Sequence, residues 1–459
     1  MLGTLLRPDY EKLIRDKDWK KLRAAFEDLD APDLAEIVED FPLGDSAVIF
    51  RILRKERAAE LFEYLPLELQ TKLVQSLADE QLVKVLNDMA PDDRTRLFEE
   101  LPPEVTRRAL ESLSPSELKI ARQLLGYPEG SAGRYMTPEY MAVRPDMTAV
   151  EALAYIRKHG KHRETLNIIY ITDEKGRLVS DLRLATLVMA PPDTKVKDIE
   201  DRQVVSIPAT TGSEDVVAAF EKWDRVALPV TDSQGILLGI ITVDDVLDVA
   251  EEEATEDIQK LGGMQALEAP YMDSPFLDMI RKRAGWLAVL FVGEMLTATA
   301  MGYFQHEIEK VVVLALFVPL IISSGGNSGS QATSLIIRSL AVRELEGSDW
   351  VRVLRREALS GIVLGSILGL IGFLRIVLWP NRIAVYGPHF AGVAIAVSLS
   401  LVGVVTFGTI CGSMLPFLLR RLGLDPATAS APFVATLVDV SGLVIYFTTA
   451  SVVLKQLFH

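Results

Sequence analysis

The spacing of hydrophobic and polar positions changes along the chain, and the first part has the spacing of short helices. From Asp9 to Tyr127, apolar residues recur three and four apart in stretches of about a dozen residues, which is typical of amphipathic helices. Two segments match at a spacing of 36 residues: LFEYLPLELQTKLVQSL from Leu61 and LFEELPPEVTRRALESL from Leu97. We therefore predict an all-α superhelical domain of stacked repeats over residues 1–128.

The pattern that follows alternates strands with helices, and it does so twice. Residues 143–190 contain the β-rich run LNIIYITDEKGRLV, in which Glu-Lys-Gly indicates a tight turn. Residues 204–249 repeat this order with ALPVTDSQGILLGIITVDDVLDV. We predict a tandem β-α-β-β-α unit over residues 129–250, divided into about 137–200 and 201–250.

A run of carboxylates comes next. The segment DDVLDVAEEEATEDIQKL begins at Asp244, and no basic residue lies between Asp244 and Asp257. We predict one long helix from Asp244 to Asp278. We assign residues 251–280 to an acidic connecting helix that leads into the apolar part of the chain.

Residues 281–459 are apolar in long stretches and predict an all-α membrane domain. The shortest stretch has about 19 residues, close to the length with which a helix crosses the hydrocarbon core of a bilayer. We expect five spans, over residues 285–303, 311–337, 359–379, 390–419 and 432–457.

Basic residues predict the orientation of these spans. They precede the first span, lie between the second and third, and follow the fourth, and these three positions are all on the same side of the membrane: Arg281, Lys282, Arg283, Arg338, Arg343, Arg352, Arg355, Arg356, Arg420 and Arg421. Since loops rich in Lys and Arg stay in the cytosol, we expect a multi-pass protein of the cell inner (plasma) membrane. Its N-terminus would then be cytosolic and its C-terminus outside.

Charge separates the two halves and narrows the function. Residues 1–280 carry 34 basic and 54 acidic residues, whereas residues 281–459 carry 14 and 9. An acidic surface of this size argues against nucleic acid as a partner and suits metal cations. The sequence contains no phosphate loop, nucleophile elbow or His-Glu metal motif, so we do not expect an enzyme. The lone cysteine, Cys411, allows no disulfide within the chain.

Polar residues inside the apolar stretches are the strongest functional signal. Asp439 lies within PFVATLVDVSGLVIYF, and an ionised carboxylate at that depth needs a protein or water partner. The second span reads SSGGNSGSQATS after LALFVPLII, which predicts a lining of a cavity or close packing of small residues. Glu294 falls about 14 Å into the first span at 1.5 Å per residue, so it either lines a water-filled region or is protonated and structural.

Two parts of this interpretation are made more specific by resemblances to known protein families. The segment GIITVDD, with Gly239, Thr242 and Asp245, resembles the closing strand and helix start of cystathionine-β-synthase-type (CBS) modules, which pair and often bind adenine nucleotides. The first copy departs from that pattern, because Ser180 and Asp181 occupy the corresponding turn. The resemblance implies tandem α/β CBS domains and makes ATP a candidate ligand of the pair.

Over essentially its whole length the chain resembles the MgtE family of magnesium channels. The segments that carry the resemblance are TVDDVLDV with ATEDIQKLG, FVPLIISSGGNSGSQATSLIIR, MLPFLLRRLGLDP and PFVATLVDVSGL. The family implies a homodimer in the lipid bilayer that conducts Mg²⁺ into the cytosol and closes when Mg²⁺ binds its acidic cytosolic domains.

The resemblance also implies functional residues. In the pore, the family's carboxylate falls on Asp439, with the carbonyl of Ala435 and the segment from Gly325 to Asn327 near the hydrated ion. The family's cytosolic sensor acids fall on Glu60, Asp92, Glu214, Asp224, Asp245, Asp248, Glu253, Glu256 and Asp257, and Asp425 matches a further acid at the cytosolic mouth. Three positions depart from the family: Arg96 replaces an acid, Ser330 replaces an Asn, and Ala431 replaces the Asn before Pro432.

Two alternatives from other classes stay open on the sequence. One is a transporter of another divalent cation, Co²⁺ or Mn²⁺, because carboxylates discriminate poorly among hydrated divalent ions. The other is a CBS-regulated membrane signalling protein in which the spans serve only as an anchor. Asp439 weighs against the second alternative, since an anchor has no use for a carboxylate inside the membrane.

Overall fold

The computed structural model describes residue 10 and residues 12–27, 29–76, 79–161, 163–199, 204–267, 271–272, 274–305 and 312–458. The chain divides into two compact units, Met1–Glu253 and Ala254–His459. Each unit is built around its own cores, and the two are described separately below.

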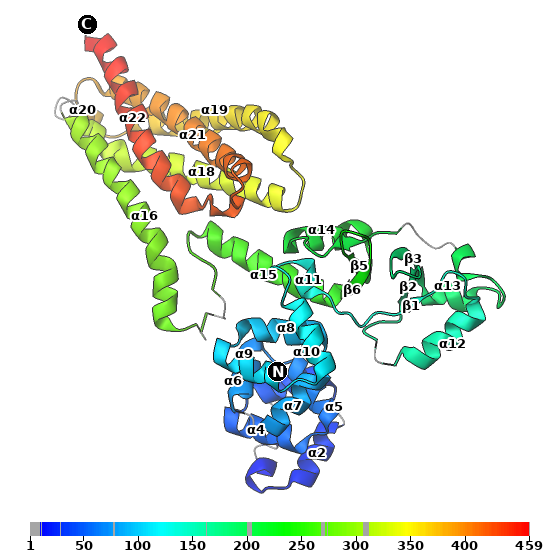
Figure 1. Ribbon diagram of the computed structural model, residues 1–459. Coiled ribbons are helices and arrows are strands. Elements are labelled where there is room, and N and C mark those ends of the chain that lie inside the picture. The colour runs from blue at the N-terminus through cyan, green and yellow to red at the C-terminus, as the bar shows by residue number, and fades with distance from the viewer. Residues whose placement is uncertain are drawn as a thin grey trace. The chain divides into compact units, whose positions relative to one another are not determined.

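The first unit begins with a stack of short helices (Figure 1). Each helix packs on the helix two places further along the chain, as α3 does on α5, α5 on α7, and α6 on α8, so the stack grows into a superhelix around one continuous apolar core. The 36-residue match corresponds to α5 and α6 in one copy and α8 and α9 in the other. The helices are α2 (Trp19–Glu27), α3 (Ala31–Glu39), α4 (Leu43–Ile52), α5 (Lys55–Glu63), α6 (Leu67–Ser76), α7 (Asp79–Asp88), α8 (Pro91–Glu100), α9 (Pro103–Glu111) and α10 (Pro115–Leu124).

Two three-stranded sheets follow, one for each copy of the predicted β-α-β-β-α unit. In both sheets the first strand is parallel to the second and the third is antiparallel to it. Gly176 and Gly235 make the tight turns between the second and third strands with positive φ angles of 79° and 78°, which favour glycine. The elements are α11 (Ala132–Tyr135), β1 (Ala142–Val143), α12 (Ala149–His159), β2 (Ile168–Thr172), β3 (Leu178–Arg183), α13 (Leu184–Met189), β4 (Ile207–Pro208), α14 (Ser213–Trp223), β5 (Ala227–Thr231) and β6 (Leu237–Thr242), with a 3₁₀ turn η1 (Val196–Asp198) between the copies.

The two copies pack as a pair, as the CBS resemblance predicts. Ile168 and Tyr170 of β2 share a small core with Ala227 and Ile240 of the second sheet. Beside this core, Arg225 Nη1 donates to Asp181 Oδ2 at 2.8 Å, and the side chains of both residues are more than nine-tenths buried. Removing one member of such a pair would leave a buried charge uncompensated. Asp181, which departs from the CBS pattern, therefore lies in β3 and joins the two copies.

The acidic helix is shorter than predicted. Helix α15 runs from Val243 to Leu261, and the next helix, α16 (Phe276–Tyr303), starts only at Phe276. The chain turns at Gly262 and Gly263, and Gly263 has a φ of +75° with no room for a Cβ against the indole of Trp286. The prediction of one helix from Asp244 to Asp278, and of a continuous helix over residues 251–280, is therefore wrong. Glycine in the left-handed region ends the helix one turn after the last acids.

The second unit contains five helices long and apolar enough to cross a membrane, which confirms the five predicted spans among the described residues. Helix α21 is central and packs on α18, α19 and α22, whereas α16 contacts chiefly α22 and buries none of its residues within this chain. The helices are α16, α18 (Val318–Ala341) with its leading 3₁₀ turn η2 (Val312–Phe317), α19 (Trp350–Val377) with its leading 3₁₀ turn η3 (Gly347–Asp349), α20 (Arg382–Tyr386), α21 (Phe390–Arg421), η4 (Pro426–Thr428) and α22 (Ala431–Phe458).

Small residues let these helices approach closely. A Cβ on Gly365 of α19 would lie 2.7 Å from the Cα of Val402 on α21, and a Cβ on Gly325 of α18 would lie 2.5 Å from Val404 Cγ1. The glycine-rich run of the second span is thus part of a continuous helix, and Gly325 is buried against α21 and α22. Of the two interpretations of this run, a cavity lining or close helix packing, close packing explains Gly325. The backbone of α18 is unbroken.

Candidate cation sites

The membrane unit brings two carboxyl groups together. Asp439 lies in the third turn of α22, half-buried, and its side chain is hydrogen-bonded to that of Glu294 on α16. Gly293 lies against Thr436 in the same contact, since a Cβ on that glycine would come within 2.9 Å of Thr436 Cγ2. Two carboxyl groups close enough to share a hydrogen bond repel each other unless a proton or a cation lies between them. The sequence indicated each residue separately, but it contains no signal that would have paired them.

The other pore residues expected from the resemblance lie around the same stretch of α22. Ala435 stands one helical turn before Asp439 and faces Gly326, whose added Cβ would lie 3.6 Å from the Cβ of Ala435. Asn327 is exposed on α18, and its Nδ2 donates to Ser323 Oγ at 3.4 Å. Gly325 is buried between α21 and α22. Thus Gly326 and Ala435 are in contact, whereas Gly325 and Asn327 point to different sides of α18.

Two of the departures from the family lie together at the start of α22. Ser330 Oγ donates to the carbonyl oxygen of Ala431 at 3.3 Å and so links α18 to the first turn of α22. Ser430 Oγ accepts from the indole Nε1 of Trp286 at 3.1 Å and from the backbone of Phe433. These contacts hold the start of α22 against the middle of α18 and the first half of α16.

A lysine joins two of the predicted acidic sites next to the membrane helices. Lys260, in the last turn of α15, donates to Asp425 Oδ2 at 2.7 Å and also forms an ion pair with Glu256. Burial lowers the pKa of this ammonium group, but its hydrogen bonds to Asp425 and Glu256 raise it by more. Lys260 therefore neutralises a position where the resemblance implies acids that bind a cation.

The first unit contains an acidic cleft with a volume of about 580 Å³ between the helical stack and the CBS pair. Loops and first turns bring the acids here: α8 begins just before Asp92 and Asp93, and α15 begins just before Asp244. Its lining carboxylates are Glu63, Asp92, Asp93, Glu164, Asp244, Asp245 and Asp248. We refer to these seven residues as the acidic cleft.

Burial and mutual repulsion disfavour the charged forms of five of these acids. Burial, followed by nearby acids, raises the pKa of Glu63, Asp93 and Glu164 to about 7. The pKa of Asp245 is raised to about 6 by burial, although its hydrogen bonds from Thr242 partly oppose the shift. The negative charges of the carboxylates in the acidic cleft are thus not fully compensated by cationic side chains.

Asp92 is the least accessible of these acids. Its relative exposure is 8%, and its Oδ1 atom is buried with no hydrogen-bond partner. Burial, and then the charge of Asp245, raises its pKa well above the ordinary value. Carboxylate oxygens are the donors that Mg²⁺ prefers, so the chemistry of the cleft fits this ion. In the described residues, however, no three acids converge closely enough to coordinate one metal directly.

The chain itself supplies one cation at the cleft. Arg96 on α8 donates from Nη1 to Asp248 Oδ2 at 2.8 Å and also pairs with Glu252, so it connects the helical stack to α15. Because its side chain is 41% exposed, each ion pair contributes modestly. The acidic segment therefore does have compensating cations, Arg96 and Lys260, which the sequence alone did not reveal.

The remaining predicted sensor acids do not line the cleft. Glu60 is exposed and pairs with Arg57 at 2.8 Å. Glu214 and Asp224 lie at opposite ends of α14, and Glu253 accepts a hydrogen bond from Ser213 at the start of that helix. Asp257 follows Glu256 on α15. Conversely, Glu63, Asp93 and Glu164 line the cleft and were missed. Glu63 lies almost one helical turn after Glu60, but only the fold shows which of the two faces the CBS pair.

Comparison with known proteins agrees with this architecture. Residues 8–130 match the family described as MgtE intracellular N domain, residues 132–192 and 196–252 each match the CBS domain, and residues 318–449 match the MgtE family of divalent cation transporters. The chain is 43% identical over 334 residues to "Magnesium transporter MgtE" of Thermus thermophilus, which covers 72% of each protein. The chain belongs to the MgtE family. A second relative with the same name, from Bacillus subtilis, is 30% identical over 341 residues, 74% of this chain and 73% of that protein.

Solved structures confirm the fold of the first unit. "Crystal structure of the cytosolic domain of the Mg2+ channel MgtE in complex with ATP" matches with a TM-score of 0.50 and 34% identity, covering 52% of this chain and 98% of that one. "Crystal structure of the soluble part of a magnesium transporter" has a TM-score of 0.52 at 24% identity, covers 55% of this chain and 99% of that one, and supports the fold alone. The predicted MgtE architecture, a helical N domain, tandem CBS domains and five apolar helices, is confirmed. The chain is a multi-pass membrane protein of a transporter family.

Proposed function

We propose that this chain forms a magnesium channel that admits Mg²⁺ into the cytosol and closes when Mg²⁺ binds its acidic cytosolic unit. The contact between Asp439 and Glu294 in the membrane unit carries the proposal, because it places negative charge among helices that otherwise bury apolar residues. The relatives named as magnesium transporters support Mg²⁺ as the ion.

Hydrated Mg²⁺ is the chemically favoured cargo at Asp439. The ion gives up its waters reluctantly and demands octahedral geometry, so carboxylates contact it best through retained water. In a homodimer with two-fold symmetry each chain presents one Asp439 to the axis, and two carboxylates then face one ion. Helix α16, which buries no residue within a single chain, supports assembly with a second copy.

The gating proposal rests on the acidic cleft. Seven carboxylates line it, Asp92 is buried and three others are partly buried, and Arg96 is the cation among the residues that line it. Divalent cations that bridge these acids would stabilise the compact arrangement of helical stack and CBS pair, and their loss would release it. Helix α15 begins at the cleft and ends at Lys260, which contacts Asp425 before α22, so movement at the cleft can reach the pore helix.

The direct test is Mg²⁺ influx into vesicles that contain the reconstituted full chain, followed with an enclosed Mg²⁺-sensitive dye. The variant Asp439→Asn keeps the size of the side chain and removes its charge, and we expect it to lose flux about tenfold or more. Glu344→Gln, an exposed acid on a loop between α18 and α19, is the matched control. Unchanged flux in Asp439→Asn would rule out this carboxylate as the pore ligand, whereas absence of Mg²⁺ flux through the unmodified chain would favour the signalling alternative.

The same assay addresses the identity of the ion and the orientation. Co²⁺ and Mn²⁺ replace Mg²⁺ in the outer solution, and preferential flux of either ion would favour the alternative transporter. Protease added to vesicles of each orientation tests whether the N-terminus is cytosolic and the C-terminus outside, as the basic loops predict.

We further propose ATP as a ligand of the CBS pair, because the 34% identical cytosolic domain is named as a complex with ATP. Equilibrium binding of ATP to the full chain tests this, with inorganic phosphate as the control ligand. Asp181 is held by Arg225 in the first copy, so we expect the second copy, which contains Gly239 and Thr242, to bind the nucleotide.

A further inference from the structure

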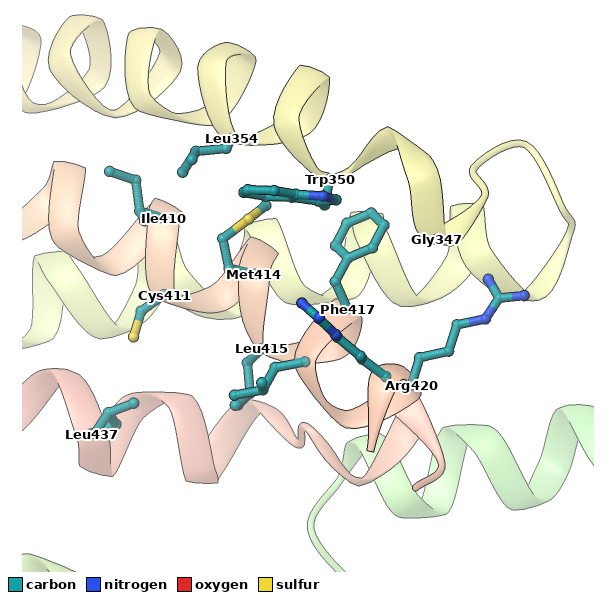
Figure 2. Close-up of a pocket in the computed structure, with 12 residues that line it drawn as sticks. Gly347, Trp350, Leu354, Ile410, Cys411, Met414, Leu415, Phe417, Arg420 and Leu437 are labelled. Carbon is teal, nitrogen blue, oxygen red and sulfur yellow. The ribbon is translucent and has the colours of Figure 1, made fainter. Parts of the chain in front are cut away.

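The membrane unit carries an apolar groove that the proposed transport does not use. It lies between α19, α21 and α22, has a volume of about 1,070 Å³, and is lined by apolar side chains that include Trp350, Leu354, Ile410, Met414, Phe417 and Leu437. Figure 2 shows Trp350, Met414 and Phe417 next to one another in this groove. None of these residues contributes to the Asp439 contact or to the acidic cleft.

One end of the groove is basic. Arg420 and Arg421, in the last turn of α21, belong to the lining, and both are exposed. In Figure 2 the side chain of Arg420 extends past Phe417 at this end. Within the part of the chain that the structure describes, neither guanidinium group forms an ion pair, since the nearby Asp425 is bound by Lys260. One end of an otherwise apolar groove therefore carries two positive charges that form no ion pair among the described residues.

The length of the groove matches one leaflet of a bilayer. From Ile410 to Arg421, α21 rises about 16 Å at 1.5 Å per residue, which is about half of the roughly 30 Å hydrocarbon core. Cys411 therefore lies near the middle of the membrane and the two arginines lie at the level of the lipid headgroups. An acyl chain in the groove would meet apolar side chains, and its phosphate would meet guanidinium groups, whose fork geometry suits phosphate.

We propose that this groove binds an anionic phospholipid, with one acyl chain along α21 and the headgroup phosphate between Arg420 and Arg421. The matching length and the unpaired positive charges favour such a lipid over a second copy of the chain, which would have to supply both an apolar ridge and acids at its end. The inference goes beyond the proposed transport and does not depend on which ion is carried.

The only cysteine of the chain gives a direct test, since Cys411 lines the groove. The full chain is purified free of lipid in detergent, and the rate at which N-ethylmaleimide modifies Cys411 is measured by mass spectrometry. Phosphatidylglycerol or phosphatidylcholine is then titrated into the detergent. We expect phosphatidylglycerol to protect Cys411 at about a tenfold lower lipid fraction than phosphatidylcholine, from the attraction of two arginines to a negative lipid.

The variant Arg420→Gln/Arg421→Gln should abolish this preference and leave both lipids equally protective. Arg355→Gln/Arg356→Gln is the matched control, because it removes the same charge from exposed positions of α19 outside the groove, and it should keep the preference. Leu354→Trp fills the groove without changing charge, and native mass spectrometry should then show less retained phosphatidylglycerol.

Three outcomes would overturn the proposal. Equal protection by both lipids in the unmodified protein would show that the groove accepts any acyl chain. Loss of the preference in the α19 control would show a general effect of charge. Protection without lipid that disappears on dilution would show that a second copy of the chain covers the groove.

Discussion

The negative charges of the carboxylates are compensated in different ways in the two units of this protein. In the first unit, Asp181 is buried with Arg225 at 2.8 Å, whereas the acidic cleft holds seven acids beside Arg96. In the membrane unit, Asp439 contacts another acid, Glu294. A buried pair serves structure, while acids without sufficient positive charge are arrangements that a cation from solution can complete. The degree of internal neutralisation thus separates the structural acids from the candidate cation sites.

The largest expected effect is in the membrane unit. If Asp439 and Glu294 hold the ion together, Glu294→Gln should lower Mg²⁺ flux about tenfold, and no more than Asp439→Asn does, because Asp439, the proposed pore carboxylate, remains. Flux into vesicles measures both variants. Wild-type flux in Glu294→Gln would show that Asp439 acts without its neighbour.

The second prediction concerns the acids of the first unit that have the least positive charge around them. Asp92→Asn/Asp245→Asn should raise the Mg²⁺ concentration needed for closure about tenfold, since two of the acids that bridge the cation are neutral. The same variant should resist protease better without Mg²⁺, because repulsion at the cleft is reduced. Limited proteolysis of the full chain over a Mg²⁺ titration measures both effects, with Glu104→Gln, an exposed acid on α9 outside the cleft, as the control. Closure at the wild-type concentration would exclude these two acids as the sensor.

The third prediction uses pH in place of metal. Glu63 and Glu164 have pKa values of about 7 in the folded cleft against an ordinary 4.5, so the compact arrangement binds protons more tightly than separated domains do. Protons should therefore stabilise it as the pH falls through 7, and this stabilisation is lost as the pH rises through the same value. Without Mg²⁺, protease protection should be greater at pH 6 than at pH 8. Saturating Mg²⁺ should remove most of this dependence, and a pH effect that Mg²⁺ leaves unchanged would contradict the cleft as its source.

The smallest effect is expected at Arg96. Arg96→Gln removes two exposed ion pairs, and at about 0.2–0.5 kcal/mol each, in the lower part of the range for such pairs, the Mg²⁺ concentration for closure should rise about twofold to fivefold. Arg57→Gln, which removes the ion pair to Glu60 away from the cleft, is the matched control. A closure concentration that falls in Arg96→Gln would show that the arginine competes with the metal and does not assist it.

Local sequence patterns were sufficient to predict the helices and strands. They were insufficient to predict which residues of different elements contact one another. The 36-residue match, the Gly176 turn and the five apolar spans could be predicted because each depends on residues close together in the chain. The long connecting helix was predicted wrongly, although Gly262 and Gly263 follow Leu261 directly and are a local signal for the end of a helix. The packing of Gly263 against Trp286 joins distant residues and could not be predicted from a local pattern.

The sequence by itself determined the fold class, the family and the presence of acids where apolar residues are expected, since composition and period carry that information. Only the tertiary structure decided which acids meet: Glu63, Asp93 and Glu164 around the cleft, Glu294 beside Asp439, and Arg96 and Lys260 as internal cations. The physical reason is that electrostatic interaction depends on distance and burial, and both are set by packing between elements far apart in the chain.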